Sequence, residues 1–392
     1  MAVKTKVFHV ITKLELGGAQ KVTLMTLERL PSDRYDLALL SGPEGLLVDR
    51  AERIPGLRRF WIPELVRELH PLKDVIAFFR LWRLFRRERP DIVHTHSSKA
   101  GILGRWAAWL AGVPYIFHTA HGFAFHDYQG RLARASYIWL ERLARPITTQ
   151  PVVVSKANAA RAEKLGILRP GEWILCRDAV PIAEFAESSP RRRRLAEWGI
   201  PSDRTVVGMV ACFKPQKAPL DFIDVAARVL AERRDVHFVM AGDGELRATV
   251  EARIRHHGIG DHVTLLGWRR DMPEVYRNLD VFVLTSLWEG QPCVFAEAMA
   301  SGLPIVATEA DGASEAIVDG ETGFVCPPRD IDAMSRMVAR LVSNPELRRE
   351  MGERGRARAR EFDIDTSVAR LESAYRAHLE GRGNSVFVAD TP

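Results

Sequence analysis

Short apolar runs alternate along the chain with longer segments in which apolar residues recur at helical spacing. Short apolar runs bounded by turn residues are typical of buried strands, whereas the longer periodic segments are typical of amphipathic helices. The first half predicts strands at 7–11, 36–40, 92–94, 115–117 and 152–154, with helices that include 19–30, 72–89 and 102–111. This alternation predicts a parallel sheet with helices on both faces.

The alternation stops at 183–204, a stretch with two prolines, a Ser-Ser pair and the arginine run 191–194. A second series then predicts strands at 206–211, 236–241, 263–266, 281–284 and 305–307. We therefore expect a doubly wound domain at 1–182, a linker at 183–204, a second such domain at 205–362, a helix at 363–380 and a frayed tail at 381–392. Ligands of such folds bind beyond the carboxyl ends of the strands, so we expect the site in a cleft between the domains.

Composition narrows the function classes only slightly. Of the 392 residues, 46% are hydrophobic and the net charge is +6, which permits a nucleotide or an anionic membrane face as a partner. No nucleic-acid motif is recognisable, so no nucleic-acid partner is expected. The four cysteines are widely spaced, as in a reduced, cytoplasmic protein, and neither a secretory leader nor an 18-residue apolar run is evident.

Two glutamates eight positions apart are the most informative feature of the chain. Glu289 follows the apolar run 281–284, and Glu297 lies about one turn inside the helix predicted next. Carboxylates accept hydrogen bonds from sugar hydroxyls, and a helix N-terminus attracts phosphate. This combination suits a nucleotide sugar, with further donor contacts expected from the intervening residues Gly290, Gln291, Pro292, Cys293 and Val294.

The segment 286–302 resembles the Glu-x7-Glu signature of family 4 retaining glycosyltransferases, and the resemblance extends from residue 17 to about 379. It implies the GT-B fold: two Rossmann-like domains facing across a cleft, the first binding the acceptor and the second the nucleotide-sugar donor. The terminal helix would return to pack on the first domain. The resemblance implies that Glu297 binds the ribose hydroxyls of the donor and that Glu289 orients the sugar ring.

Glycines mark two further turns at strand ends, where a backbone can approach a ligand closely. Gly17 and Gly18 match the glycine-rich loop that the family places against the donor diphosphate. Gly242 and Gly244 match the nucleotide side of the donor site. Trp268 falls in the segment beside the base, where stacking on the base and ordinary packing remain alternatives.

Lys217 matches the lysine of the family's diphosphate clamp, within the segment 208–221. The clamp arginine of the family is replaced by Cys212, and a thiol cannot supply a fixed cationic fork. Either Lys214 provides the second charge or the clamp is weaker. A second departure is Arg177-Asp178-Ala179-Val180, where many relatives read Asn-Gly-Val.

Histidines follow two predicted strands of the first domain. His121 matches the family's histidine facing the transferred sugar, with His118 and His126 as rivals and a structural strand-end role as the alternative. His94 and His96 lie two apart on one strand and therefore share a face. They would either contact the acceptor or serve as hydrogen-bonded strand-end residues. A zinc site would need a third ligand, which is not evident, so no metal is expected.

The helix at 72–89 carries two apolar stripes and a basic face. Val75, Ile76, Phe79 and Trp82 form one stripe, and Phe78, Leu81 and Phe85 form the other. Such a helix either packs on the sheet with a solvated basic side or lies on an anionic membrane. Peripheral contact with the inner face of the cytoplasmic membrane is therefore one expectation.

Together these features predict a retaining glycosyltransferase that moves a hexosyl group from a nucleotide diphosphate sugar to a sugar or lipid-linked acceptor in surface polysaccharide or glycolipid synthesis. His121, Lys217 and Glu289 are the expected catalytic residues. No cofactor is expected, and the lack of an Asp-x-Asp motif at a strand end favours a metal-independent reaction. The alternatives are a sugar-nucleotide epimerase of the same architecture and a non-catalytic nucleotide-sugar-binding protein.

Overall fold

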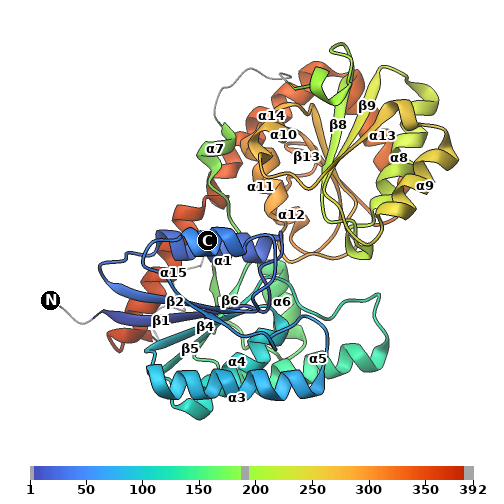
Figure 1. Ribbon diagram of the computed structural model, residues 1–392. Coiled ribbons are helices and arrows are strands. Elements are labelled where there is room, and N and C mark those ends of the chain that lie inside the picture. Colours follow the sequence, from blue (N-terminus) through green and yellow to red (C-terminus); the bar gives the residue numbers. More distant parts are fainter. Residues whose placement is uncertain (1–3, 187–193, 384–392) are drawn as a thin grey trace. The chain divides into compact units, whose positions relative to one another are not determined.

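The computed structural model describes residues 4–186 and 194–383. The chain forms two compact units: unit 1 contains 1–178 and 364–392, and unit 2 contains 179–363 (Figure 1). Each unit is a parallel sheet between helices, as the alternation predicts. Most of the arginine run at 191–194 and of the tail at 381–392 lies outside the described residues.

The sheet of unit 1 has seven parallel strands in the order β3-β2-β1-β4-β5-β6-β7. Its order reverses direction between β1 and β4, the kind of switch point beside which ligands bind in doubly wound folds. The strands are β1 (Thr5–Val10), β2 (Tyr35–Ser41), β3 (Arg58–Trp61), β4 (Ile92–His96), β5 (Tyr115–Ala120), β6 (Gln150–Val153) and β7 (Ile174–Leu175).

Successive side chains on each central strand of unit 1 point to opposite faces of the sheet. Phe8, Val10 and Val93 face one way and form a core with α3 and α4, whereas His9 and His94 face the other way, toward α15. The helices are α1 (Gly18–Arg29), α2 (Val48–Arg53), α3 (Pro71–Glu88), α4 (Ser98–Ala111), α5 (Arg131–Ala144), α6 (Lys156–Lys164) and α15 (Ile364–Leu379), with a 3-10 turn, η1 (Arg145–Ile147).

Helix α15 returns the end of the chain to unit 1, as the resemblance implies. Its Tyr375 is fully buried, with its ring centroid 4.8 Å from that of Phe117 on β5. Ser367 Oγ donates to the carbonyl of Arg177 at 2.8 Å, and His378 Nε2 lies 3.0 Å from Gln150 Oε1. Helix α15 therefore completes the core of unit 1 rather than extending unit 2, and of the predicted segment 363–380 only Asp363 belongs to unit 2.

Unit 2 has six parallel strands in the order β10-β9-β8-β11-β12-β13. They are β8 (Thr205–Val210), β9 (Val236–Ala241), β10 (Val263–Gly267), β11 (Val281–Leu284), β12 (Ile305–Thr308) and β13 (Gly323–Cys326). The helices are α7 (Ile182–Ala186), α8 (Pro219–Glu232), α9 (Arg247–His257), α10 (Met272–Arg277), α11 (Cys293–Ala300), α12 (Ala313–Ala316), α13 (Ile331–Ser343) and α14 (Pro345–Ala359). Short 3-10 turns are η2 (Ala196–Trp198), η3 (Pro215–Lys217), η4 (Gly260–His262) and η5 (Arg360–Phe362).

The stretch expected to be a linker, 183–204, packs into unit 2 wherever it is described. Phe185 of α7 lies against Tyr276 of α10, with ring centroids 5.7 Å apart. Leu195 and Ile200 are buried, and the backbone N–H of Arg194 donates to Asn278. The division between the units falls between Asp178 and Ala179, a few residues before the expected boundary.

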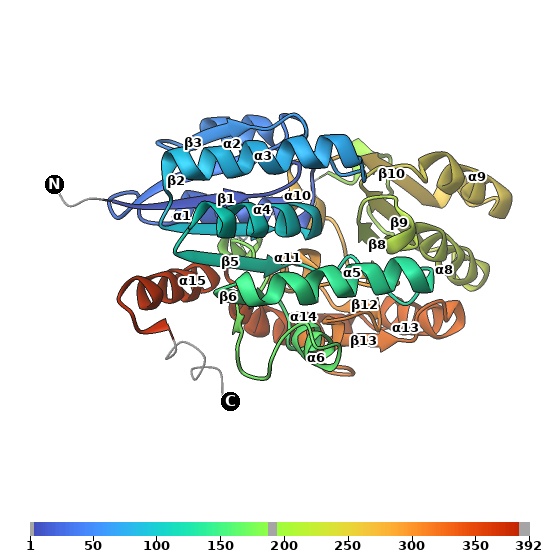
Figure 2. The ribbon, with the colours of Figure 1, turned by 90° about the horizontal axis from the view of Figure 1, so that it is seen from below.

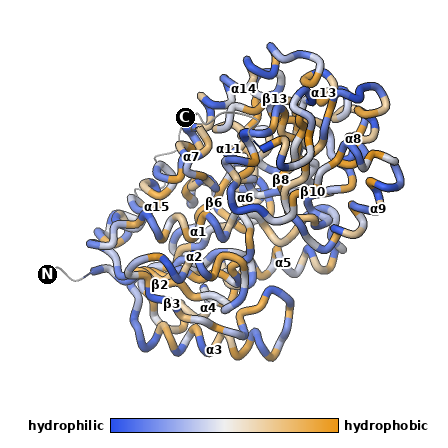
Figure 3. The backbone as a smooth tube through the Cα atoms, turned by 45° about the horizontal axis from the view of Figure 1, so that its top comes forward, coloured by the Kyte–Doolittle hydropathy of each residue, from blue (hydrophilic) through white to orange (hydrophobic). Residues whose placement is uncertain are grey.

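Helix α3 buries only one of its two predicted apolar stripes. Leu81 and Phe85 join the core of unit 1, and Phe78 packs against its edge. The other stripe is open to solvent, with Val75 53% and Phe79 56% exposed. Figure 3 shows hydrophobic and hydrophilic segments alternating along this helix. Among the described residues, no helix is long and apolar enough to cross a membrane.

Candidate active site

The two glutamates of the signature lie at the carboxyl edge of the unit 2 sheet. Glu289 sits in the loop between β11 and α11, and Glu297 lies within α11, as the sequence predicts. Their exposed fractions are only 9% and 4%. Buried carboxylates require partners, because an unpaired buried charge is very costly. The partners found here define what each glutamate can do.

Glu289 forms an ion pair with Lys217, the predicted clamp lysine, in which Nζ contacts Oε1. The backbones around the two residues are also joined. Leu287 N donates to the Gln216 carbonyl at 2.8 Å, and Gln216 Nε2 donates to the Trp288 carbonyl at 2.9 Å. These contacts hold the loops after β8 and β11 together and present a cation and a carboxylate side by side.

Glu297 accepts a hydrogen bond from the hydroxyl of Tyr276 on α10 at 2.7 Å. Tyr276 is fully buried, and that burial, followed by the charge of Glu297, raises the pKa of its hydroxyl well above the usual value. The hydroxyl therefore remains a donor at all physiological pH values. It holds the Glu297 carboxylate in a fixed orientation inside the helix.

The N-terminus of α11 lies between the two glutamates. Pro292 is its N-cap residue, and no side chain of the described residues caps it. Cys293 is buried and Val294 is half-buried in the first turn, after Gly290 in the loop. The preceding Gln291 is 4% exposed, yet neither its Oε1 nor its Nε2 has a hydrogen-bond partner among the described residues.

The turn after β9 requires glycines because its backbone lies very close to the loop after β8. Gly242 and Gly244 have φ values of 138° and 155°, which side-chain-bearing residues rarely adopt. A Cβ on Gly242 would lie 1.9 Å from the Ala211 carbonyl oxygen. The close approach also involves Phe213, beside Cys212 and Lys214, which are both half-buried. Trp268 follows β10 and is 43% exposed.

The other predicted glycine loop belongs to unit 1. Gly17 is the N-cap residue of α1 and Gly18 begins the helix, with no side-chain cap in this described region and no acidic residue in the first turn. Gly17 has an extended backbone, and a Cβ there would meet only the side chain of Gln20. The helix end therefore carries positive potential that an anion can use.

His121 lies just beyond β5 with both ring nitrogens bonded inside unit 1. Its Nδ1 is 2.6 Å from Asp178 Oδ1, and its Nε2 is 3.0 Å from His96 Nδ1. Of its predicted rivals, His118 is buried with Nδ1 2.9 Å from Thr95 Oγ1, and burial lowers its pKa well below the usual value. His126 is also half-buried, and burial lowers its pKa.

His94 and His96 are almost completely buried, at 0% and 3% exposure. Burial lowers the pKa of each well below the usual value, so both rings are neutral. Direct contact with an acceptor requires exposed surface, which these two residues lack. Their burial favours the alternative interpretation, in which they are hydrogen-bonded strand residues.

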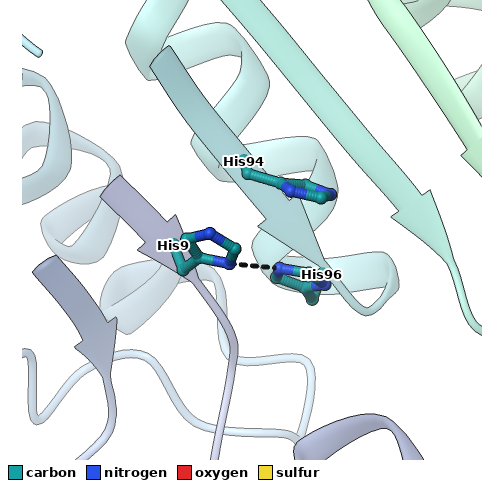
Figure 4. Close-up of side chains that lie close together, drawn as sticks. All are labelled: His9, His94 and His96. Carbon is teal, nitrogen blue, oxygen red and sulfur yellow. Dashed lines mark hydrogen bonds between the residues drawn. The ribbon is translucent and has the colours of Figure 1, made fainter. Parts of the chain in front are cut away.

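A third imidazole, which the sequence pattern did not reveal, joins this pair. His9 on β1 is directly opposite His94 in the sheet, and its Nδ1 is 2.9 Å from His96 Nε2 (Figure 4). A ligand atom from each of the three lies within 4.8 Å of the others, close enough to hold a metal ion. The sequence pattern also assigned no site role to Asp178, Tyr276 or Tyr375. Of these, only Asp178 had a signal that could have identified it, because it lies where many relatives read Asn-Gly-Val.

The chain matches two sequence models that together cover most of its length. The family described as glycosyl transferases group 1 matches residues 190–358, and the glycosyl transferase 4-like domain matches residues 17–175. An Escherichia coli protein named UDP-Gal:alpha-D-GlcNAc-diphosphoundecaprenol alpha-1,3-galactosyltransferase is 34% identical over 88% of this chain and 89% of its own. A GDP-mannose-dependent alpha-mannosyltransferase of Mycobacterium tuberculosis is 28% identical over 84% and 85%.

Solved structures share the fold. Anabaena HepE, solved in complex with UDP and glucose, has a TM-score of 0.81, with 19% identity over 95% of this chain and 100% of that one. WaaG, described as a glycosyltransferase involved in lipopolysaccharide biosynthesis, has a TM-score of 0.77, with 16% identity over 93% and 98%. These similarities bear out the predicted GT-B fold.

The unpaired amide of Gln291 generates a prediction. An unpaired buried polar group costs about 1–3 kcal/mol. Gln291→Leu should therefore raise the Tm of the ligand-free protein by a few degrees and weaken binding of the nucleotide sugar. Differential scanning fluorimetry and calorimetric titration would measure both effects. The matched control is Gln216→Leu, which breaks a formed hydrogen bond and should lower the Tm. If Gln291→Leu lowers the Tm as much as the control, the amide is already paired in solution.

Proposed function

Because the chain belongs to the group 1 glycosyltransferases, which use nucleotide sugars in polysaccharide and glycolipid synthesis, we propose that it is a retaining, metal-independent hexosyltransferase with a lipid-linked acceptor. The contact between Lys217 and Glu289 carries the mechanistic part of this proposal. It supports the proposal because a cation of the kind that a leaving diphosphate needs lies directly beside a carboxylate of the kind that binds sugar hydroxyls.

We infer that the donor exchanges this ion pair for two new contacts. The diphosphate would replace Glu289 as the partner of Lys217, and the released carboxylate would bind hydroxyls of the hexose. Charge then develops on the leaving diphosphate against Lys217 and the N-terminus of α11. The Gly17-Gly18 turn would add backbone N–H groups, and Glu297, held by Tyr276, would bind the ribose.

We propose the roles that the family resemblance implies for the remaining residues. Lys214 is the second cation beside Cys212, and Gly242, Gly244 and Trp268 line the nucleotide side. His121 is assigned to the transferred sugar. No cofactor is assigned.

The donor and acceptor are proposed from the E. coli relative. Its name specifies UDP-galactose as donor and a sugar on diphosphoundecaprenol as acceptor. The anomeric phosphate of UDP-galactose is alpha, and the named linkage is alpha, so a transfer of that kind keeps the anomeric configuration. We propose the same chemical class here: a uridine nucleotide hexose and a polyprenyl-diphosphate sugar.

Such an acceptor lies in a membrane, and unit 1 has a surface suited to one. Helices α3, α4 and α5 cover the same face of the sheet (Figure 2). Large apolar side chains are exposed on all three, namely Leu72, Val75, Ile76, Phe79, Trp82, Trp109, Leu110, Leu132, Trp139 and Leu143. Arg83 and Arg86 are exposed on α3 among them. Apolar and cationic groups together suit the surface of an anionic bilayer, and we propose that this face docks there.

Substitution of Lys217 should separate its catalytic role from its structural one. Lys217→Ala should lower kcat by roughly 10²-fold or more, because it removes charge aimed at the leaving group. It also leaves Glu289 buried without its cation, so the Tm should fall. Adding Glu289→Gln should restore much of the Tm but none of the kcat. Transfer from UDP-galactose to a synthetic polyprenyl-diphosphate sugar would measure turnover. A larger loss in Lys214→Ala would make Lys214 the clamp residue.

Chelation tests the metal-independent mechanism. With charge stabilisation supplied by lysine and backbone N–H groups, excess EDTA should leave the transfer rate within about twofold of the untreated rate. Recovery of a large loss by added magnesium or manganese would overturn this part of the proposal.

Docking on anionic lipid should depend on α3. Each exposed arginine near the surface should contribute about 1 kcal/mol, lost at high salt. Flotation with phosphatidylglycerol–phosphatidylcholine liposomes should therefore fall in Arg83→Gln/Arg86→Gln and in Val75→Ser/Phe79→Ser. The matched charge control is Arg349→Gln/Arg354→Gln on α14 of unit 2, which should float normally. Failure of the unaltered protein to float at low salt would refute membrane docking.

A further inference from the structure

A continuous line of polar side chains crosses the interior of unit 1 beneath α15. It begins at Asp178, whose Oδ1 is 2.6 Å from His121 Nδ1. His121 Nε2 is 3.0 Å from His96 Nδ1, and His96 Nε2 is 2.9 Å from His9 Nδ1. Three imidazoles are therefore joined end to end, each through both of its ring nitrogens.

The line continues through the C-terminal helix. His9 Nε2 is 3.3 Å from the hydroxyl of Tyr375, and that hydroxyl is 2.5 Å from His94 Nδ1. His94 Nε2 is 2.7 Å from Thr119 Oγ1, where the line ends. Strand alternation explains the arrangement, because neighbouring strands place these side chains on the face that α15 covers.

The contacts have a consistent direction. A carboxylate only accepts, so Nδ1 of His121 donates to Asp178. A neutral ring with its proton on Nδ1 accepts at Nε2, so His96 donates to His121 from its own Nδ1. The same rule makes His9 donate to His96 and the Tyr375 hydroxyl donate to His9. His94 then donates from Nδ1 to Tyr375 and accepts at Nε2 from the Thr119 hydroxyl. Every contact receives one donor and one acceptor.

The rings must be neutral for this pattern to hold, and their burial favours that state. Burial lowers the pKa of His9 to about 3 and lowers those of His94 and His96 well below the usual value. With the three buried rings neutral and the Tyr375 hydroxyl donating to one of its two histidine neighbours, only one other arrangement satisfies all the contacts. If His121 carries two protons, its Nε2 donates to His96, and every contact beyond it reverses.

We propose that His96, His9, Tyr375 and His94 are positioning residues for His121, forming a hydrogen-bond chain in which the protons on His121 fix the tautomer of every buried ring. The inference rests on the proposed role of His121 at the sugar. A His121 with its single proton on Nε2 would set two acceptors, its bare Nδ1 and the Asp178 carboxylate, against each other. The hydrogen-bond chain therefore holds His121 in one orientation. Asp178 lies at one end of it, and Tyr375 of α15 joins His9 to His94 toward the other end.

A metal ion is the other ligand that three buried histidines suggest, and the ring geometry does not favour it. The rings of His94 and His96 are stacked, with centroids 4.3 Å apart and planes 28° apart. Those of His9 and His96 are also stacked, at 5.1 Å and 15°. Imidazole lone pairs lie in the ring plane, so lone pairs of stacked rings point side by side rather than toward a common ion. Hydrogen bonds already use all six nitrogens.

The decisive measurement is the tautomer of each ring. Two-bond ¹H–¹⁵N spectra of histidine-labelled protein, assigned with single His→Gln variants, report which nitrogen carries the proton. The proposed hydrogen-bond chain requires that His9, His94 and His96 share one tautomer. That tautomer is Nδ1–H if His121 is neutral and Nε2–H if His121 is doubly protonated. Different tautomers among the three rings, or a doubly protonated buried ring, would overturn the proposal. So would one equivalent of Zn²⁺ binding with loss of these N–H signals.

Tyr375→Phe tests the link to turnover, because it removes only the hydroxyl that bridges His9 and His94. We expect kcat to fall roughly tenfold or more while KM for the donor stays unchanged. The matched control is Tyr35→Phe, a buried ring packed on Tyr375 but outside the chain, which should keep both constants. Unchanged kcat in Tyr375→Phe would refute the positioning role. If the unaltered protein transfers no sugar, the proposed function fails, while the tautomer measurement still decides the chain.

Discussion

Parallel pairing of every strand is the constraint on which both parts of the candidate site depend. Parallel strands all end at the same edge of their sheet, so the loops that follow them are brought together however far apart they lie in sequence. In unit 2 this joins Lys217, after β8, to Glu289, after β11. In unit 1 the parallel register of β1 and β4 sets His9 directly opposite His94. The candidate site residues of unit 2 therefore gather at one edge of its sheet, and the histidines of unit 1 gather on one face of its sheet.

The second constraint is that buried polar groups need partners. Glu289 has Lys217, and Glu297 has Tyr276, so neither carboxylate is left without a partner when no ligand is bound. Gln291 is an exception in the same loop, and so is the buried Ser286 hydroxyl, which has no hydrogen-bond partner among the described residues. A ligand of this site must therefore do two things. It must displace the contact between Lys217 and Glu289, and it must supply a hydrogen-bond partner to the amide of Gln291. Both features favour a ligand with several oxygen atoms over an apolar one.

The sequence predicted the fold because hydrophobic alternation is a local signal, and β9 and β11 match their predicted ranges. It missed three strands. β3 carries two arginines in four residues and β7 has only two residues, so neither makes an apolar run. β13 (Gly323–Cys326) has only four residues and begins with a glycine. The Glu-x7-Glu spacing located the donor loop for the same local reason. The partners of its residues were not predictable, because Tyr276 and Lys217 meet the glutamates only through the order of strands in the sheet. The inward side of α3 was also undecided, since both of its stripes are apolar.

The return of α15 has a consequence for how the protein is made. The face of the unit 1 sheet that carries His9, His94 and Phe117 is covered by Tyr375, which is synthesised only after all 185 residues of unit 2 (179–363). At ordinary translation rates that interval is roughly 10–40 s. During it, the nascent first domain has a complete set of strands but an uncovered layer of aromatic and imidazole rings. The order of synthesis thus makes the N-terminal domain the last to be finished, and its open face is a natural place for a chaperone to act.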